Sequence, residues 1–237
     1  MCISLAELPL KSIDIFWENF SPDSQLSPQS DPLNLVLYFP SSLNRVHVES
    51  FIYNQFKLKH NAEISQYMPY LLSLENANHE VLSAAGFRPS CNEQLFLEQY
   101  LDEPIEMLLS GYFGEKIYRN SIIEVGNLAS DCPGSSRLMI MAMTCLFDQQ
   151  GFEWVVMTGT NELLNIFRNL QLQPLPLTPA EASRLNKEQD KWGSYYTHDP
   201  QVMTGNIKAG HEELFKSNYY RQFISNLHTF SLPGCAQ

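Results

Sequence analysis

The spacing of apolar residues along the chain predicts a protein that mixes strands with helices. Residues 33–39 are apolar over the length of a strand, which favours a buried strand. Residues 44–59 carry an apolar side chain every three or four positions, so we expect a helix that covers a sheet with one face. These side chains are Val48, Phe51, Ile52 and Phe56. Two apolar runs, at 68–74 and 80–87, are separated by polar turn formers, which predicts an antiparallel hairpin.

The pattern is most informative between residues 122 and 160. It predicts a strand, a loop, an apolar helix and a second buried strand, over residues 122–128, 129–136, 137–150 and 153–157. Gly151 is placed to end the helix in the left-handed conformation. This succession is a βαβ unit, whose strands should be parallel and joined by a right-handed crossover. Along the first strand, Ile123, Val125 and Asn127 should share one face.

The remaining segments predict shorter elements around this unit. Helical pieces are expected at residues 93–100, 104–109, 162–169, 179–188 and 212–227. A loop is expected around Pro174, Pro176 and Pro179. Residues 21–32 are rich in serine, proline and aspartate, which predicts a solvated loop. We expect one α/β domain over residues 33–210, preceded by a leading segment at 1–32 and followed by a helix and tail at 211–237.

The charge balance narrows the classes of partner. Lysine and arginine total 15 against 26 aspartate and glutamate residues, which gives a formal net charge of −11. An acidic protein is repelled by phosphate backbones and by anionic lipid, so we expect no nucleic acid partner. A membrane-spanning helix needs about 20 apolar residues, whereas the best candidate, residues 138–147, is half that length and predicts a buried core helix. We therefore expect no stable membrane insertion.

Cysteines and histidines indicate neither a disulfide framework nor a metal site. The five cysteines are odd in number, scattered, and never spaced as Cys-x-x-Cys. The six histidines form no His-x-x-x-His pair at metal-ligand spacing. The first ten residues contain Glu7 and no basic start, so no secretory signal is visible. We expect reduced thiols, no bound metal and a cytoplasmic protein.

The loop before the apolar helix is the first candidate for a binding site. Pro133-Gly134-Ser135-Ser136 leads into that helix. The free backbone N–H groups of such a loop, together with the positive end of the helix dipole, suit a pyrophosphate or a phosphopantetheine group. The same residues also fit an ordinary turn in which Ser136 caps the helix. Spacing alone leaves both interpretations open.

Glu124 and Asn127 are the first candidates for catalytic chemistry. We place both near the carboxyl end of the first strand of the βαβ unit, where open α/β sheets bind ligands. A carboxylate at this position can take a proton from an attacking amine, directly or through water. The alternative is that Glu124 pairs with a basic residue such as Arg88 or Arg119 in a structural network.

An aromatic turn spans residues 192–196. Trp192, Tyr195 and Tyr196 are clustered there. Aromatic side chains of this kind either line the bottom of an acyl-binding pocket or pack in the hydrophobic core. The sequence leaves both roles open.

Several longer runs resemble a known family. The thermostable hemolysin family of bacteria is similar to this chain over residues 45–210, through the runs FRPSCNEQLFLEQYLDEPIE, IIEVGNLAS followed by G-x-x-R, WVVMTGT and WGSYY. That family resembles a branch of the N-acetyltransferase (GNAT) superfamily. The resemblance implies a GNAT-like acyltransferase fold with a mixed sheet and extra C-terminal helices. It also implies a β-bulged fourth strand that splays from the fifth and admits a pantetheine arm.

The motifs of that superfamily are matched only in part. In its pyrophosphate loop, Gln/Arg-x-x-Gly-x-Gly/Ala, this chain has Asp131, Gly134 and Ser136 at the three defined places. An acidic residue at the first place disfavours tight binding of the CoA pyrophosphate. After the fifth strand, the superfamily shows Asn-x-x-Ala-x-x-Leu-Tyr. Phe167-Arg168 replaces Leu-Tyr here, so the usual tyrosine proton donor is missing.

More distantly, the chain is similar to acyl-homoserine-lactone synthases, which take acyl chains from acyl carrier protein. Arg45 opens a comparable early helix. Glu124 stands where their Glu-x-Ser-Arg motif has its glutamate, and Asn127 replaces the arginine of that motif. The resemblance implies a long-chain acyl donor without implying the same acceptor.

Residues and resemblance together predict an acyltransferase that moves an acyl group from a phosphopantetheine thioester, on acyl carrier protein or CoA, to an amine-bearing small molecule. Glu124 and Asn127 are the expected catalytic residues. The expected thioester-binding residues are Leu128, Ala129, Gly134, Ser135, Ser136 and Arg137. The expected substrate-binding residues are Arg45, Arg88, Glu98 and Asn165. Two alternatives are a membrane-active hemolysin and a non-catalytic acyl- or pantetheine-binding module, which the fold alone does not separate.

Overall fold

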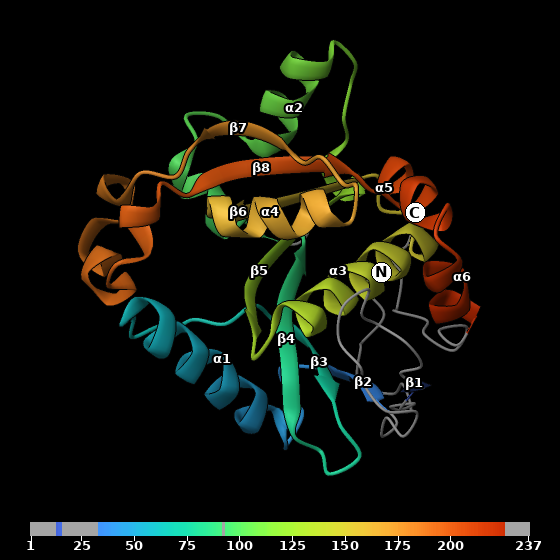
Figure 1. Ribbon diagram of the computed structural model, residues 1–237. Coiled ribbons are helices and arrows are strands. Elements are labelled where there is room, and N and C mark those ends of the chain that lie inside the picture. Colours follow the sequence, from blue (N-terminus) through green and yellow to red (C-terminus); the bar gives the residue numbers. More distant parts are fainter. Residues whose placement is uncertain (1–12, 16–32, 92, 226–237) are drawn as a thin grey trace.

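The computed structural model describes residues 13–15, 33–91 and 93–225, which build one mixed sheet of eight strands (Figure 1). The strands lie in the order β1-β2-β3-β4-β5-β6-β8-β7. Neighbouring strands are antiparallel except β5 and β6, which run parallel. Their bounds are β1 (Ile13–Ile15), β2 (Leu33–Tyr38), β3 (Tyr70–Glu75), β4 (Val81–Pro89), β5 (Ile122–Ser130), β6 (Trp154–Gly159), β7 (Leu175–Pro179) and β8 (Gln201–Asn206).

Helices lie against the sheet and at its ends. Within the described residues, the α-helices are α1 (Arg45–His60), α2 (Ile105–Phe113), α3 (Pro133–Gln149), α4 (Asn161–Asn169), α5 (Ile207–Phe215) and α6 (Asn218–Ser225). The 3₁₀ helices are η2 (Phe96–Tyr100), η3 (Arg119–Ser121), η4 (Ala182–Trp192) and η5 (Tyr195–His198). The fold is therefore the mixed α/β class that the sequence predicted.

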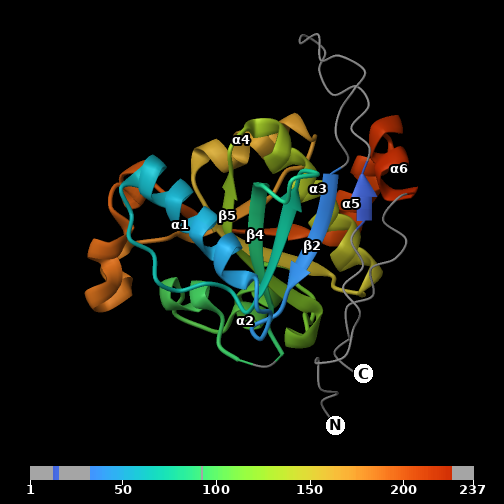
Figure 2. The same ribbon diagram turned by 90° about the horizontal axis from the view of Figure 1, so that it is seen from below.

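The two faces of strands β3 and β4 are covered by different helices. In β4, Ala84 packs with residues of α1, whereas the adjacent Ala85 and Phe87 pack with residues of α3. In β3, Leu71 and Leu72 divide in the same way. This alternation is the two-residue period of a strand buried on both sides. Figures 1 and 2 show α1 and α3 on opposite sides of the sheet, and the prediction that residues 44–59 cover a sheet is confirmed.

The βαβ unit is the centre of the fold, and its main features were predicted correctly. β5 and β6 are parallel and are connected through α3. Gly151 follows α3 with φ +77°, in the left-handed region that glycine adopts without a steric cost. Residues 138–147 lie within α3, and nine of these ten side chains are buried. The hairpin of β3 and β4 is also confirmed.

A β-bulge interrupts the pairing of β4 with β5. The register shifts between Ala84 and Gly86, so that β5 carries one extra residue there. Asn127 lies at this point with φ +51°, and its Oδ1 accepts a hydrogen bond from the backbone N of Met68 at 2.8 Å. On the other edge of β5, pairing with β6 ends at Val125, opposite Met157. The two strands therefore separate over the rest of their length, as the resemblance implied.

Some boundaries differ from those that the sequence predicted. α3 begins at Pro133 rather than at residue 137, because proline suits the first position of a helix. Residues 175–179 form strand β7 instead of a loop; β7 is at the sheet edge, where proline is tolerated. The last helix is divided into α5 and α6, and β8 precedes α5. The pieces expected at 93–100 and 179–188 are the 3₁₀ helices η2 and η4. The loop expected at 21–32 lies outside the described residues.

The bulge allows a stability prediction at Asn127. Asn127→Ala should lower the free energy of unfolding by about 2 kcal/mol, because alanine resists the left-handed conformation and removes the hydrogen bond to Met68. Asn127→Gly should lower it by only about 1 kcal/mol, because glycine accepts that conformation and only the hydrogen bond is lost. Urea unfolding of both variants measures the difference. Equal losses in the two variants would show that the backbone conformation of residue 127 carries no cost.

Candidate functional site

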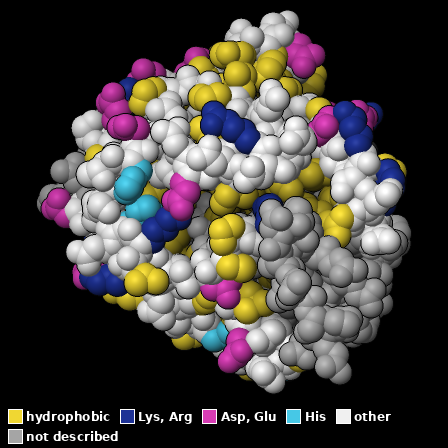
Figure 3. All heavy atoms as spheres, in the orientation of Figure 1, with side chains coloured by type: hydrophobic (Ala, Val, Ile, Leu, Met, Phe, Trp, Pro, Cys, Tyr) yellow, Lys and Arg dark blue, Asp and Glu magenta, His cyan; other side chains and the backbone are white. Residues whose placement is uncertain are grey.

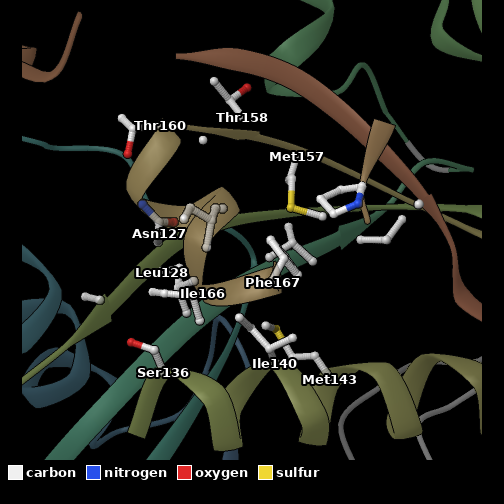
Figure 4. A pocket seen from close by; sticks show the side chains of 18 of the residues that line it. Asn127, Leu128, Ser136, Ile140, Met143, Met157, Thr158, Thr160, Ile166 and Phe167 are labelled. Carbon is white, nitrogen blue, oxygen red and sulfur yellow. The ribbon is translucent and has the colours of Figure 1, made fainter. Parts of the chain in front are cut away.

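A cavity of about 780 Å³ follows the gap between β5 and β6. Figure 4 shows its middle section, where side chains from β5, α3, β6 and α4 face one another. One end of the cavity reaches the C-terminal turn of α1 and the end of η4, and the other reaches α5. On the face drawn in Figure 3, hydrophobic side chains gather between α4 and α3. The cavity therefore begins where the two central strands separate.

Glu124 lies at the base of this gap. It is the third residue of β5, so our placement of it near the carboxyl end of the strand is wrong; instead, it immediately precedes Val125, where pairing with β6 ends. Its side chain lines the cavity although the residue is only 2 % exposed. The carboxylate accepts hydrogen bonds from the backbone N of Leu97 at 2.8 Å and of Phe96 at 3.0 Å.

The environment of Glu124 holds its pKa close to neutral pH. Burial raises the pKa from its ordinary value of 4.5 to about 7, because a buried carboxylate loses its hydration. The two backbone hydrogen bonds and the nearby Arg88 oppose this rise. A carboxyl group that titrates near pH 7 inside a cavity has the property needed for a general base.

Among the described residues, no ion pair joins Glu124 to an arginine, which was its alternative role. Arg119 binds Glu98 and Glu106, each at 2.7 Å. Arg88 lies opposite Glu124 in the register of β4 and β5. Its guanidinium is 3.3 Å from Glu93 instead and donates to the backbone O of Gln94 at 3.0 Å. Glu124 is thus held by backbone N–H groups.

Three of the six residues expected at the thioester line the cavity: Leu128, Ala129 and Ser136. The Ser136 hydroxyl is hydrogen-bonded to that of Ser130. Ser135 is buried and donates to Asp131 and to backbone oxygens. Gly134, Ser135 and Arg137 are not part of the lining.

The start of α3 presents little positive charge to the cavity. Lys59 and Arg88 are the only lysine and arginine side chains in the described lining, and they stand on α1 and β4. Beside the first turn of α3 the lining instead contains Asp131, Cys132 and Pro133. In this part of the cavity, the backbone N–H groups of that turn are therefore the main groups that can bind a phosphate.

Of the four expected substrate-binding residues, the structure brings only Arg88 to the cavity. Arg45 is buried and donates to the backbone O of Met68 and of Pro69, at 2.6 and 2.7 Å, which fixes the chain before β3. Glu98 accepts from Arg119 and caps η2. Asn165 is exposed and accepts a hydrogen bond from Arg168 at 3.0 Å. Protein contacts account for these three side chains.

The cavity also contains an apolar chamber that the sequence did not reveal. Its walls are side chains of α3, β6 and α4, namely Ile140, Met143, Phe147, Met157, Ile166 and Phe167. Phe167 stands at the leucine place of the Leu-Tyr pair and faces the chamber (Figure 4). Arg168 stands at the tyrosine place; it is exposed and donates a hydrogen bond to Asn165. The Leu-Met-Ile-Met-Ala-Met run in the middle of α3, residues 138–143, was the available signal, because flexible methionine side chains suit adaptable apolar surfaces.

The described residues include no group of three or more histidine, cysteine, aspartate and glutamate side chains that could hold a metal ion. Among the same residues, no helix is both long enough and apolar enough to cross a membrane.

Comparison with known proteins gives one family and several similar folds. The family model described as thermostable hemolysin matches residues 39–211. No curated protein sequence matches the chain. The AHL synthase LasI has a similar structure, with a TM-score of 0.57 and 9% identity, over 79% of this chain and 97% of LasI. The structure of TofI in its apo form has a TM-score of 0.54 and 15% identity, over 78% of this chain and 98% of TofI. FeeM, an N-acyl amino acid synthase from uncultured soil microbes, has a TM-score of 0.51 and 10% identity, over 78% of this chain and 99% of FeeM. At these identities the likeness shows the fold.

The raised pKa of Glu124 makes stability depend on pH. Because the unfolded chain ionises near pH 4.5 and the folded chain near pH 7, the stabilising contribution of the protonated form is complete below pH 4.5 and is lost as pH rises to about 7. Between these pH values, the wild type should lose about 3 kcal/mol of unfolding free energy relative to Glu124→Gln, whose side chain does not titrate. Urea unfolding of both proteins at several pH values measures this difference. Parallel pH profiles would contradict the shift.

Proposed function

Because the chain belongs to the thermostable hemolysin family and holds a buried carboxylate at the base of a split sheet, we propose that it is an acyltransferase. It moves an acyl group from a phosphopantetheine thioester to an amine-bearing small molecule. The observation that carries this proposal is the separation of β5 from β6 immediately after Glu124. The gap can admit a pantetheine arm, with a candidate base at one side and an apolar chamber at the other. The folds shared with LasI and FeeM support the same class of reaction.

The reaction is a direct attack of the amine on the thioester. The nitrogen forms a bond to the carbonyl carbon, and the bond from that carbon to sulfur breaks. Glu124 accepts the proton released by the nitrogen, directly or through water. The thiolate takes up a proton and leaves as a thiol. Because Arg168 stands where the superfamily has its tyrosine proton donor, the protonated Glu124 or solvent supplies this proton. The backbone N–H of Leu128 polarises the carbonyl oxygen, whereas that of Ala129 lies on the β4 side of β5, in the Ala84–Ala129 pair. No covalent enzyme intermediate is needed.

The donor is, by this proposal, carried on acyl carrier protein rather than on CoA. CoA brings a diphosphate and a further phosphate on its ribose, whereas a carrier protein presents pantetheine on a single phosphate. The described lining beside the first turn of α3 offers N–H groups, Asp131 and no cationic side chain. Such a surface suits one phosphate better than three.

The apolar chamber is the proposed site of the acyl chain. Its walls come from α3, β6 and α4, and it extends to Gly210 on α5. An alkyl chain that enters from the gap between β5 and β6 would leave water for this apolar lining, which is favourable by about 0.8 kcal/mol for each buried CH₂ group.

The catalytic role of Glu124 is tested by turnover. Glu124→Gln should lower kcat about a hundredfold, because it keeps the size of the side chain and removes the base. The wild-type rate should rise with pH to about 7 and then level off, as the carboxyl group ionises. Steady-state kinetics with an acyl donor and a panel of amines measures both effects.

Donor binding serves as the control in that experiment. It should be nearly unchanged in Glu124→Gln, because the carboxylate acts on the acceptor. If the folded wild type binds an acyl donor but transfers nothing to any amine, the chain is a non-catalytic acyl-binding module. The acidic Asp131 and the Arg168 at the tyrosine position are the features that favour this second candidate.

Chain-length preference tests the assignment of the chamber. A side chain added at Gly210 would approach Leu172 and Thr144, both of which line the cavity, with its Cβ 3.6 and 3.8 Å from them. Gly210→Leu should therefore lower kcat/KM for a palmitoyl donor at least tenfold relative to a butyryl donor. Gly111→Leu is the matched control, since Gly111 is exposed on α2 and has nothing within 4 Å of an added Cβ. Equal effects of the two substitutions on both donors would remove the chamber from the proposal.

A further inference from the structure

The end of the cavity beyond Glu124 is walled by rings. We call it the aromatic pocket, and its residues are Phe56, His60, Phe96, Trp192 and Tyr195. Trp192 is in contact with three of the other rings, with centroids 5.4 Å from Tyr195, 5.9 Å from Phe96 and 6.2 Å from Phe56. His60 lies edge to face with Tyr195 at 5.3 Å.

This wall is continuous with the proposed base. The backbone N of Phe96 donates a hydrogen bond to the Glu124 carboxylate at 3.0 Å, and the Phe96 ring contacts Trp192. Tyr195 joins Trp192 to His60. The aromatic pocket therefore runs from the reacting end of the cavity to the end of α1.

The Trp-Gly-Ser-Tyr-Tyr turn holds His60 in place. Gly193 has φ +52°, and a Cβ at that position would be only 2.1 Å from the backbone O of His60. The same oxygen accepts a hydrogen bond from the backbone N of Ser194 at 2.8 Å. No residue other than glycine fits this approach without displacement. The turn thus both walls the pocket and positions the last residue of α1.

Two buried polar atoms beside Tyr195 have no hydrogen-bond partner among the described residues. One is Nδ1 of His60, which is 7% exposed and lines the cavity. The other is Oγ1 of Thr158, another cavity residue, whose backbone O accepts a hydrogen bond from Tyr195. Buried polar groups in native proteins are nearly always hydrogen-bonded, because a buried group without a partner has lost its hydrogen bonds to water. A ligand that enters this pocket would supply the missing partners.

We infer that the aromatic pocket binds the amine acceptor, that the acceptor carries a planar ring, and that a polar group on that ring hydrogen-bonds to Nδ1 of His60. This inference rests on the proposed function, since it names the acceptor class for the same site. The ring packs against Trp192 and Phe96, where aromatic pairs add stabilisation beyond simple burial. The amine then lies toward Glu124, which receives its proton as the C–N bond forms and the C–S bond breaks.

The protonation state of His60 suits this role. Burial lowers its pKa from the ordinary value, and the adjacent Lys59 and His198 lower it further. The carboxylate of Glu162, on α4, opposes this shift of the His60 pKa. The ring is therefore neutral near pH 7, and its Nδ1 either donates or accepts one hydrogen bond, according to the tautomer. A neutral ring also avoids repelling a protonated amine as it enters.

Three amines separate the parts of this inference in a binding experiment on the full chain. Tyramine has a ring and a hydroxyl, phenethylamine has the ring alone, and hexylamine has neither. By titration calorimetry, the wild type should bind tyramine about tenfold more tightly than phenethylamine, which is the worth of one hydrogen bond. It should bind hexylamine more weakly than either aromatic amine.

Variants of His60 then identify the group that makes the hydrogen bond. His60→Phe keeps a ring and should remove the tenfold difference between tyramine and phenethylamine. His60→Asn places a polar atom near the position of Nδ1 and should restore part of it. The matched control is His198→Phe. The His198 ring contacts that of His60 at 5.6 Å but lies on the exposed side and outside the lining, so binding should not change.

Two results would overturn the inference. One is that none of the aromatic amines binds more tightly than hexylamine. The other is that His60→Phe leaves the difference between tyramine and phenethylamine unchanged while the protein remains folded by circular dichroism. These measurements need no turnover. If tyramine binds through His60 but no acyl donor reacts with it or with any amine of the panel, the proposed function fails and the assignment of the pocket stands.

Discussion

The parallel pairing of β5 with β6 ends at Val125, and the proposed site depends on that interruption. Beyond it the backbone edges of both strands face a gap instead of each other. The bulge at Asn127 turns β5 away, and it is fixed by a left-handed backbone conformation and by a side-chain bond to the segment before β3. A continuous parallel sheet would bring these edges together and close the cavity. Sheet irregularities beside ligand sites commonly redirect a strand in this way.

Around this gap the cavity has two ends of different chemistry. Toward α3, α4 and α5 the lining is apolar, which suits an alkyl chain. Toward the end of α1 and η4 it is aromatic and contains the buried polar groups of His60, Thr158 and Glu124. Glu124 lies between these ends, where burial favours the protonated acid and the backbone donors of η2 favour the carboxylate. A pKa near neutral pH is what the proposed role requires, in which Glu124 both accepts and returns a proton.

Local sequence patterns predicted most of the helices and strands well. The features that these patterns missed depend on contacts between segments that are distant in the sequence. The apolar α3, the hairpin and the parallel β5–β6 pair follow from periodicity and turn residues. In contrast, the ion pair of Glu98 with Arg119 joins residues that periodicity does not bring together. Arg45 pairs with Glu49 one helical turn away, but periodicity does not reveal its hydrogen bond to the backbone O of Met68. His60 is the clearest case: its neighbours in the Trp-Gly-Ser-Tyr-Tyr turn are more than 130 residues away in the sequence. The motif was visible in the sequence, but the residue that it holds was not.

The most direct test of the account is a crystal structure of the protein with a non-hydrolysable thioether analogue of palmitoyl-pantetheine. The account predicts that the pantetheine arm lies in the gap between β5 beyond Val125 and β6 beyond Met157. The alkyl chain should lie between α3 and α4, and the thioether should lie beside Glu124. An analogue bound on another surface, or a chain directed away from the chamber while the gap stays empty, would contradict the claim that the split sheet is an acyl-transfer site.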